Sequence, residues 1–377
     1  MPRARVQPVD TSTGLLQRMF GVVELRVQVP GAADKDEVVL SAVTHEESAR
    51  LCSALGQPEP AAPDERVTLR VRDLLLAALT GPQISAAVSA VAGTFALADN
   101  VVDVQDGEGL LARLDTPQEI VVAVAIVLAG GYVLSFLAAI VVFAGFEAER
   151  DAQVLRIRRG LLARRGLSIP LQRVDGVVIV EGLLRGPLGL AALRLESVAH
   201  GKERAAGGTL LPLVRRREAE AVIARLIPAL AIEPGALERP PRRALRRFVL
   251  LPGVGGAIGG LAAALALVPP AWPAVCAVLA AAGGLIGLRA YRAAGIRLGG
   301  DVVVVREARL ARRTLLARRH RLQRHALVRT PLQQRAGLAD LSVTVGSGGG
   351  GKARHLEEAT ADAAFAALRG AGVRRPA

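Results

Sequence analysis

The chain has 377 residues, of which 51% are hydrophobic, 3% aromatic and 22% charged, and its formal net charge is +14. A mean hydropathy of +0.36 is too high for an ordinary soluble protein, while the charge content is too high for a chain lying wholly in a membrane. We therefore expect membrane spans combined with soluble domains. The two cysteines, Cys52 and Cys276, indicate neither a disulfide framework nor a zinc site.

One pattern of residues recurs three times along the chain. The copies align on a glycine, on an arginine sixteen residues earlier and on a polar residue two positions after that arginine: Arg5, Gln7 and Gly21; Arg173, Asp175 and Gly189; Arg321, Gln323 and Gly337. Agreement at fixed offsets indicates one domain repeated three times. We expect the glycine to be structural, since it allows a backbone conformation that a side chain would hinder. Asp175, beside Arg173, is interpreted as part of a weak surface ion pair.

The first copy, 1–57, is shorter than the others. Glu147 lies 42 residues before Gly189, whereas only 20 residues precede Gly21. The opening strands of the first copy are therefore missing, which would expose unpaired backbone edges. We expect Met1 to be a misplaced start or a fragment boundary, with two further spans upstream. A proline-containing linker, 58–73, follows this copy.

Four apolar stretches are candidate membrane spans, because crossing the hydrocarbon takes roughly 20 apolar helical residues. They are 74–98, 120–146 and the two arms, 248–268 and 274–288, of a helical hairpin placed at 248–292. The first contains Pro82 and Gln83, so a buried amphipathic helix is its alternative interpretation. Gly255, Gly259, Gly256, Gly260, Gly283 and Gly287 have helix-packing spacing, and we expect them to pack the hairpin itself.

Charge is distributed unevenly about these spans. The connection 99–119 is acidic, whereas arginines border the repeats. By the positive-inside rule, the repeats face the cytoplasm and 99–119 forms a loop on the extracytoplasmic side of the cell membrane. Arginines close to the membrane attract anionic headgroups. The predicted lipid contacts are Arg156, Arg158, Arg159, Arg242, Arg243, Arg246 and Arg247.

The second copy, 147–234, and the third, 293–374, have the pattern of short strands followed by one helix; a basic linker, 235–247, lies between the second copy and the hairpin. Apolar alternation predicts strands at 154–158, 167–169, 177–180 and 190–195, and in the third copy at 302–305, 313–316 and 341–345. The predicted closing helices begin near Glu46, Glu218 and Glu357. The fold class is thus a mixed membrane protein, in which transmembrane hairpins alternate with small barrels or sandwiches, each closed by a helix.

At this point the chain resembles a known family. The segments 167–197 and 210–220 look like the YdbS-like bacterial pleckstrin-homology (PH) domain, and 318–343 and 5–27 fit the same pattern. The arrangement of several copies with transmembrane segments between them is similar to that of the YdbT-type members. The resemblance implies a membrane protein with PH-like barrels and provides no catalytic residue.

A glycine-rich segment, 346–352, satisfies the G-x-x-x-x-G-K part of a phosphate-binding loop. The motif requires Ser or Thr next, to bind magnesium, and the chain has Ala353. The same place in the first two copies holds unrelated sequence, so we interpret the segment as a variable loop between two strands.

Other chemistry finds little support. His320 and His325 are the only histidines at a metal-ligand spacing within one copy, and they lie among arginines that would repel a cation. Stacking aromatics for nucleic acid are absent from the basic stretch 306–329. The sequence therefore predicts no enzyme activity, catalytic residue, cofactor, metal site or nucleic-acid partner.

Two classes of function remain. The first is a multi-pass cell-membrane scaffold or binding module, with its repeats in the cytoplasm, anionic lipid as one partner and another membrane protein, such as a related PH-domain protein, as a second. It would act in envelope maintenance or in resistance to toxic compounds. The alternative is a component of a transporter or export system, suggested by the glycine-rich hairpin.

Overall fold

The computed structural model describes twelve ranges of the chain, and the account below is confined to them: 9–13, 20–28, 37–44, 46–47, 50–51, 64–81, 117–151, 153–162, 164–197, 208–232, 235–267 and 272–371. The chain divides into two units, and the boundary between them runs through strands β5, β6 and β7. The first unit comprises 1–59, 66–148 and 157–167. The second comprises 60–65, 149–156 and 168–377.

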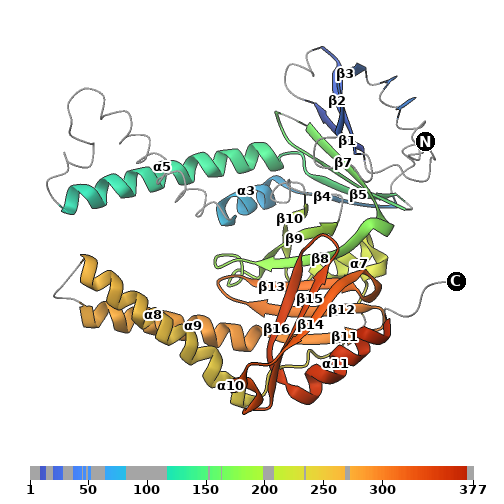
Figure 1. Ribbon diagram of the computed structural model, residues 1–377. Helices are drawn as coiled ribbons and strands as arrows, with labels where there is room; N and C mark the ends of the chain where they lie inside the picture. The colour runs from blue at the N-terminus through green and yellow to red at the C-terminus, as the bar shows by residue number, and fades with distance from the viewer. Residues whose placement is uncertain are drawn as a thin grey trace. The chain divides into compact units, whose positions relative to one another are not determined.

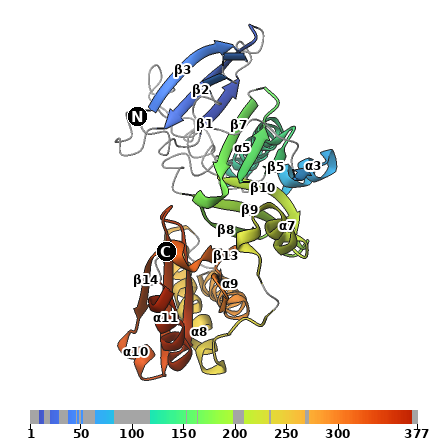
Figure 2. The same ribbon diagram turned by 90° about the vertical axis from the view of Figure 1, so that its right-hand side faces the viewer.

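The first unit contains most of a seven-stranded sheet with the order β3-β2-β1-β7-β6-β5-β4. Figure 2 shows β3, β2, β1 and β7 of this sheet side by side. Its strands are β1 (Val9–Thr13), β2 (Val22–Gln28), β3 (Glu37–Thr44), β4 (Glu65–Thr68), β5 (Glu147–Asp151), β6 (Val154–Arg159) and β7 (Arg164–Pro170). Helices α3 (Val71–Thr80) and α5 (Pro117–Phe143) belong to the same unit, and the Tyr132 hydroxyl on α5 donates a 2.7 Å hydrogen bond to the Leu79 carbonyl. Copy-one strands thus share a sheet with copy-two strands.

The second unit contains two sheets. Six strands form the order β10-β9-β8-β13-β12-β11, and three more form β14-β15-β16. The strands are β8 (Val174–Glu181), β9 (Leu190–Ser197), β10 (Thr209–Arg215), β11 (Gly295–Gly299), β12 (Val302–Ala308), β13 (Arg312–Arg318), β14 (Leu322–Val328), β15 (Leu338–Val345) and β16 (Gly350–Glu357). The unit's helices are α7 (Ala219–Leu226), α8 (Leu245–Leu267), α9 (Trp272–Ala293), the short α10 (Pro331–Gln334) and α11 (Glu358–Ala371).

The core of the third repeat lies between its two groups of strands. Val303 and Val305 of β12 pack with Leu341 and Val343 of β15, and Leu368 of α11 closes the same cluster. Each such side chain contributes about 1.5–3 kcal/mol on burial. The structure confirms the strands predicted for the third copy, at 302–305, 313–316 and 341–345, and its closing helix. It also confirms the strands and the closing helix predicted for the second copy.

Helices α8 and α9 run side by side as an antiparallel pair (Figure 1). A Cβ atom added at Gly256 would lie 2.2 Å from the Leu279 carbonyl oxygen, and one at Gly287 would lie 1.9 Å from that of Phe248. Gly260 and Gly283 approach the opposite backbone in the same way, whereas Gly255 and Gly259 have no atom within 4 Å of such a Cβ. Packing of the hairpin by its glycines is therefore confirmed for four positions and wrong for two.

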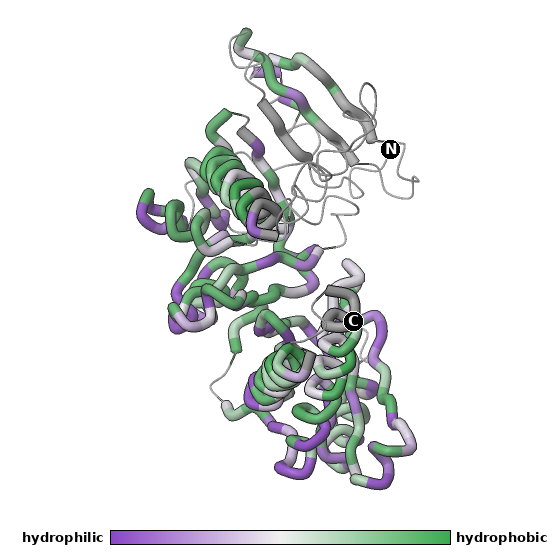
Figure 3. Tube along the Cα trace, turned by 90° about the vertical axis from the view of Figure 1, so that its left-hand side faces the viewer, coloured by the Kyte–Doolittle hydropathy of each residue, from purple (hydrophilic) through white to green (hydrophobic). Residues whose placement is uncertain are grey.

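Three of the described helices are long and apolar enough to cross a membrane. The segments are Ala125–Phe143, Arg242–Ala262 and Pro273–Ala293, with mean hydropathies of 2.5, 1.2 and 1.7. These apolar helices are coloured mainly green in Figure 3. No residue of the first segment is buried by other parts of the protein, as expected for a helix whose surface contacts lipid. Of the predicted span 74–98, only the part through Gly81 is described, and α3 occupies it; the rest, like the hairpin turn at 269–271, lies outside the described residues.

Mixed helix and sheet with several apolar helices is thus the observed fold class. The strands of one repeat, however, do not form a separate barrel, because sheets continue from one repeat into the next. The sequence pattern indicated the strands but not this division, since pairing across repeats uses the same alternation as pairing within one.

Candidate functional site: the junction between repeats

Strands β8 and β13 join the second repeat to the third. They pair antiparallel, with Val178 opposite Leu315, Ile179 opposite Thr314 and Glu181 opposite Arg312. Val178 packs in the core of the third repeat, and Val180 packs against it. The second repeat therefore supplies part of the next repeat's core.

A charged cluster marks the end of this strand pair. Glu181 is 2% exposed, and its carboxylate accepts hydrogen bonds from Arg216 Nε at 3.1 Å and lies 2.8 Å from an Arg312 guanidinium nitrogen. Arg216 also binds Glu220 at 3.1 Å. Burial lowers the pKa of Arg306 to about 10, helped by Arg216 and Arg312 and opposed by the two acids. One buried carboxylate thus compensates cations from both repeats.

The repeat motif itself lies at this junction. The guanidinium of Arg321 donates to the Gln172 carbonyl, and that of Arg318 donates to the carbonyls of Leu171 and Val174 at 2.8 and 3.0 Å. Arginines at the end of β13 and just after it therefore bind the backbone at the start of β8 and just before it. This gives the motif arginine of the third copy a clear role in joining repeats.

Asp175 corrects the sequence interpretation. It is 2% exposed rather than at the surface. Burial raises its pKa, and the guanidiniums of Arg321 and Arg318 and the backbone amide of Ser347 oppose that rise. The charged variant of the motif therefore lies buried beneath the third repeat, a position that no local sequence feature revealed.

The glycine-rich segment forms the turn between β15 and β16. Its Ser347 hydroxyl donates a 2.7 Å hydrogen bond to Glu196 of β9, and a Cβ added at Gly349 would lie 2.2 Å from the same carboxylate. A recess of about 300 Å³ here is also lined by Arg194 and Arg313. A phosphate loop connects a strand to a helix, whereas this turn connects two strands and surrounds a carboxylate of the chain itself.

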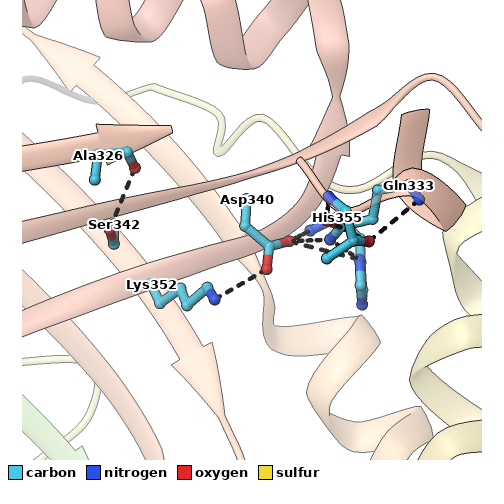
Figure 4. Close-up of polar contacts among 7 residues, drawn as sticks. Ala326, Gln333, Asp340, Ser342, Lys352 and His355 are labelled. Carbon is cyan, nitrogen blue, oxygen red and sulfur yellow. Dashed lines mark hydrogen bonds and ion pairs between the residues drawn. The ribbon is translucent and has the colours of Figure 1, made fainter. Parts of the chain in front are cut away.

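A polar cluster lies on the third repeat alone (Figure 4). The Asp340 carboxylate accepts from Gln333 Nε2 at 2.7 Å and from the His355 backbone N–H at 2.8 Å, and it lies 3.0 Å from Lys352 Nζ. Gln333 Nε2 also lies 2.9 Å from His355 Nδ1. The His355 ring meets the Phe248 ring edge to face, with centroids 5.0 Å apart. The cluster therefore connects the sheet to the first turn of α8.

The three motif glycines share one backbone conformation. Their φ angles are +67°, +65° and +59° at Gly21, Gly189 and Gly337, in the left-handed region where a side chain is strained. Arg5 and Gln7 lie outside the described residues, and Gln323 is exposed on β14.

The arginines predicted to contact lipid differ in exposure. Arg158, Arg242, Arg243 and Arg246 are exposed, although Arg243 binds Glu357 at 3.0 Å. Arg159 is buried with its guanidinium over the Phe143 ring, and Arg156 lies 3.1 Å from Asp151 with a side chain 14% exposed. Arg247 donates to the Leu332 carbonyl. Sequence proximity to a span therefore overstated how many of these cations face outward.

The described histidines, His320, His325 and His355, have different partners. His320 Nδ1 lies 3.0 Å from Asp301 Oδ2, whereas the His325 ring contacts Phe365. Among the described residues, no group of three or more His, Cys, Asp or Glu side chains is placed to hold a metal ion.

Comparisons with known proteins identify the family of this chain. The bacterial PH domain family matches residues 1–58, 83–230 and 248–371, and each range contains one motif glycine. The UPF0699 transmembrane protein YdbT of Bacillus subtilis (strain 168) is 25% identical over 396 residues, which span 96% of this chain and 78% of that protein. No solved structure matches significantly. Because the family match covers most of the sequence and apolar helices accompany it, the chain belongs to the bacterial PH domain family and is a membrane protein.

Proposed function

We propose that the chain is a non-enzymatic, multi-pass membrane protein that presents tandem PH-like domains at the inner face of the cell membrane as a scaffold or binding module. In this proposal PH-like domains alternate with transmembrane segments along the chain. The observation that carries it is the distribution of charge on the α8–α9 pair.

Every arginine of this helix pair lies at one end. Arg246 is exposed in the first turn of α8, as is Arg242 just before the helix, and Arg289 and Arg292 are exposed near the end of α9; the half-buried Arg247 follows Arg246. No charged residue occurs from 248 to 288. Since the helices are antiparallel, all of these cations gather where the pair joins the sheets. By the positive-inside rule, that end and the sheets face the cytoplasm.

The same end suits anionic headgroups. Each juxtamembrane arginine contributes about 1 kcal/mol near an anionic surface. Arg242, Arg246, Arg289 and Arg292 are exposed at this end and are therefore the arginines proposed to contact lipid. Neither the transporter alternative nor a role in envelope maintenance or toxic-compound resistance gains support from a contact in the described residues.

The topology can be tested by thiol labelling of the full-length protein in a background with Cys52 and Cys276 changed to Ala. We expect a membrane-impermeant maleimide to label Ala271→Cys in intact cells. It should label Leu310→Cys, on the exposed turn between β12 and β13, only after the membrane is opened. The reverse pattern would contradict the proposal.

The lipid contact has a separate test. The purified protein is reconstituted in vesicles of increasing phosphatidylglycerol content, and its unfolding temperature is measured. We expect the temperature to rise with anionic lipid for the wild type, and much less when Arg242, Arg246, Arg289 and Arg292 are changed to Gln. A control variant changes the exposed Arg215, Arg217 and Arg309 to Gln and should behave like the wild type. Equal responses of all three proteins would rule out this contact.

A further inference from the structure

The outer edge of β14 is the starting point. In its three-stranded sheet β14 pairs with β15, and among the described residues no strand pairs with its other edge. Unpaired backbone on a strand edge can accept another strand.

The same edge is occupied in both earlier repeats. Alignment on the motif glycines makes β14 equivalent to β8 and to β1. β8 pairs with β13 and β1 pairs with β7, and in each case the incoming strand is the last of three from the following repeat.

The two junctions also share one register. In the first, Asp10 lies opposite Leu167 and Thr13 opposite Arg164. In the second, the equivalent residues, Val178 and Glu181, lie opposite Leu315 and Arg312. Since 315 and 312 are themselves the positions equivalent to 167 and 164, the pairing is the same residue by residue. In both junctions, the same edge therefore pairs in one register with the last of the first three strands of the following repeat.

The exposed face of β14 fits this comparison. Val178 and Val180 of β8 pack with the next repeat's core. Their equivalents on β14 are Ala326, which is half-buried, and Val328, which is 43% exposed. The face that β8 gives to its neighbour is thus uncovered on β14.

We propose that the outer edge of β14 binds a strand of a bacterial PH domain carried by a different polypeptide. The bound strand is the one equivalent to β7 and β13, which is the last of the three strands that open such a domain. The inference rests on the proposed binding-module role. The test of the inference measures neither topology nor lipid binding, so the inference and the proposed function can fail separately.

Two arginines bear on which strand would fit the β14 edge. A Cβ added at Gly176 would lie 2.5 Å from the Leu316 carbonyl oxygen, and the equivalent residue on β14 is Arg324. Pairing with β14 therefore extends over four residues, as in the β1–β7 junction, and not over six. At the other end, Arg329 occupies the place of Glu181 and is already paired with Glu358, at 3.2 Å, and with Asp362, both on α11, so the incoming strand needs no acidic residue where β13 has Arg312.

A second copy of this chain fits poorly. Its two strands of this type, β7 and β13, are already paired.

The experiment is residue-specific photocrosslinking in membranes of cells that naturally make the protein. A photoreactive amino acid replaces Val328 in the full-length chain, and a matched control replaces Leu310, which is 58% exposed on another turn. Crosslinked residues are identified by mass spectrometry. We expect crosslinking from position 328 into a second bacterial PH-domain polypeptide, at the residue equivalent to Arg313, and no such product from position 310.

Two further variants test the mode of binding. Ala326→Asp should abolish the product, since it places a charge on the contacting face. Arg329→Gln should leave its yield unchanged, because Arg329 is paired within the chain by Glu358 and Asp362. Crosslinking only to this chain, to lipid or to a protein without a PH domain would overturn the proposal, as would the absence of a product.

Discussion

The buried carboxylate of Glu181 shows how one side chain can hold two repeats together. Its partners, Arg216 and Arg312, come from different repeats and keep side-chain exposures of 21% and 40%. A carboxylate buried this completely is stabilised by such partners, and its loss leaves them uncompensated.

Glu181→Gln is therefore expected to destabilise the folded protein by about 2–3 kcal/mol, the cost typical of losing charged hydrogen bonds at a partly buried site. Thermal unfolding of the purified protein in detergent measures the change. Glu218→Gln is the matched control, because Glu218 is 60% exposed and lies 4.0 Å from Arg215; we expect it to change stability by less than about 0.5 kcal/mol. Similar losses for both variants would argue against a special role for Glu181.

His355 gives the third repeat a dependence on pH. Burial lowers its pKa from 6.5; Asp340 opposes this, and Arg247, Arg354 and Lys352 add to it. Because the folded pKa lies below the unfolded value, the unfolded state binds the proton more readily. The contribution of neutral His355 to the stability of the folded protein is present above pH 6.5, and it is lost as the pH falls below that value towards the folded pKa.

We expect the unfolding temperature of the wild type to drop between pH 7.5 and pH 5.5 by more than that of His355→Asn. Asn is chosen because His355 has φ of +52°, which Asn tolerates. An equal drop in both proteins would show that other groups govern the pH response.

At the scale of elements, the α8–α9 pair depends on glycine to bring two backbones together. The end of the pair formed by the start of α8 and the end of α9 is fixed to the third repeat by Phe248, whose ring packs in a cluster with Ala244, Ala294 and Leu338. In lipid there is no hydrophobic driving force for apolar side chains to associate. Close packing of the backbones is therefore the main source of affinity between such helices.

Gly287→Val should therefore disrupt the pair, because its Cβ would overlap the Phe248 carbonyl. Gly259→Val, on the open side of α8, should be tolerated. The two variants can be compared by unfolding temperature and by the fraction that stays monodisperse in detergent. If Gly259→Val were the more damaging of the two, the packing described here would be wrong.

At the scale of the whole molecule, consecutive repeats are linked through continuous sheets. The registers of the β1–β7 and β8–β13 pairs agree residue by residue. A repeat that needs its neighbour's strand cannot fold fully by itself, so the repeats are expected to unfold cooperatively.

Cysteine pairs at equivalent positions test this arrangement. In a background without native cysteines, Ser12→Cys with Arg165→Cys and Val180→Cys with Arg313→Cys should both crosslink with a short bismaleimide, because each pair lies directly opposite. Val180→Cys with Thr314→Cys is offset by one residue onto the other face and should react poorly. Mass spectrometry of protease digests distinguishes the products, and reaction of the offset pair alone would show a different register.

The sequence by itself determined several of the strands, the closing helices of the second and third copies, the threefold repeat and three of the apolar helices. Residue period, span length and turn glycines are local properties, so strands such as β12 and β15 and the left-handed turn at Gly337 follow from short stretches of chain. Local pattern also separated the turn at 346–349 from a phosphate loop.

Only the tertiary structure decided which strands pair, which arginines are covered and where Asp175 lies. A strand with apolar alternation can pair with any similar strand, so nothing in β13 distinguishes a partner within its own repeat from β8 of the preceding one. Arg159 and Arg242 have the same charge and were both predicted to contact lipid, yet the first is buried against Phe143 and the second is exposed. Burial depends on residues far away in sequence, which is why the junction between repeats became visible only in three dimensions.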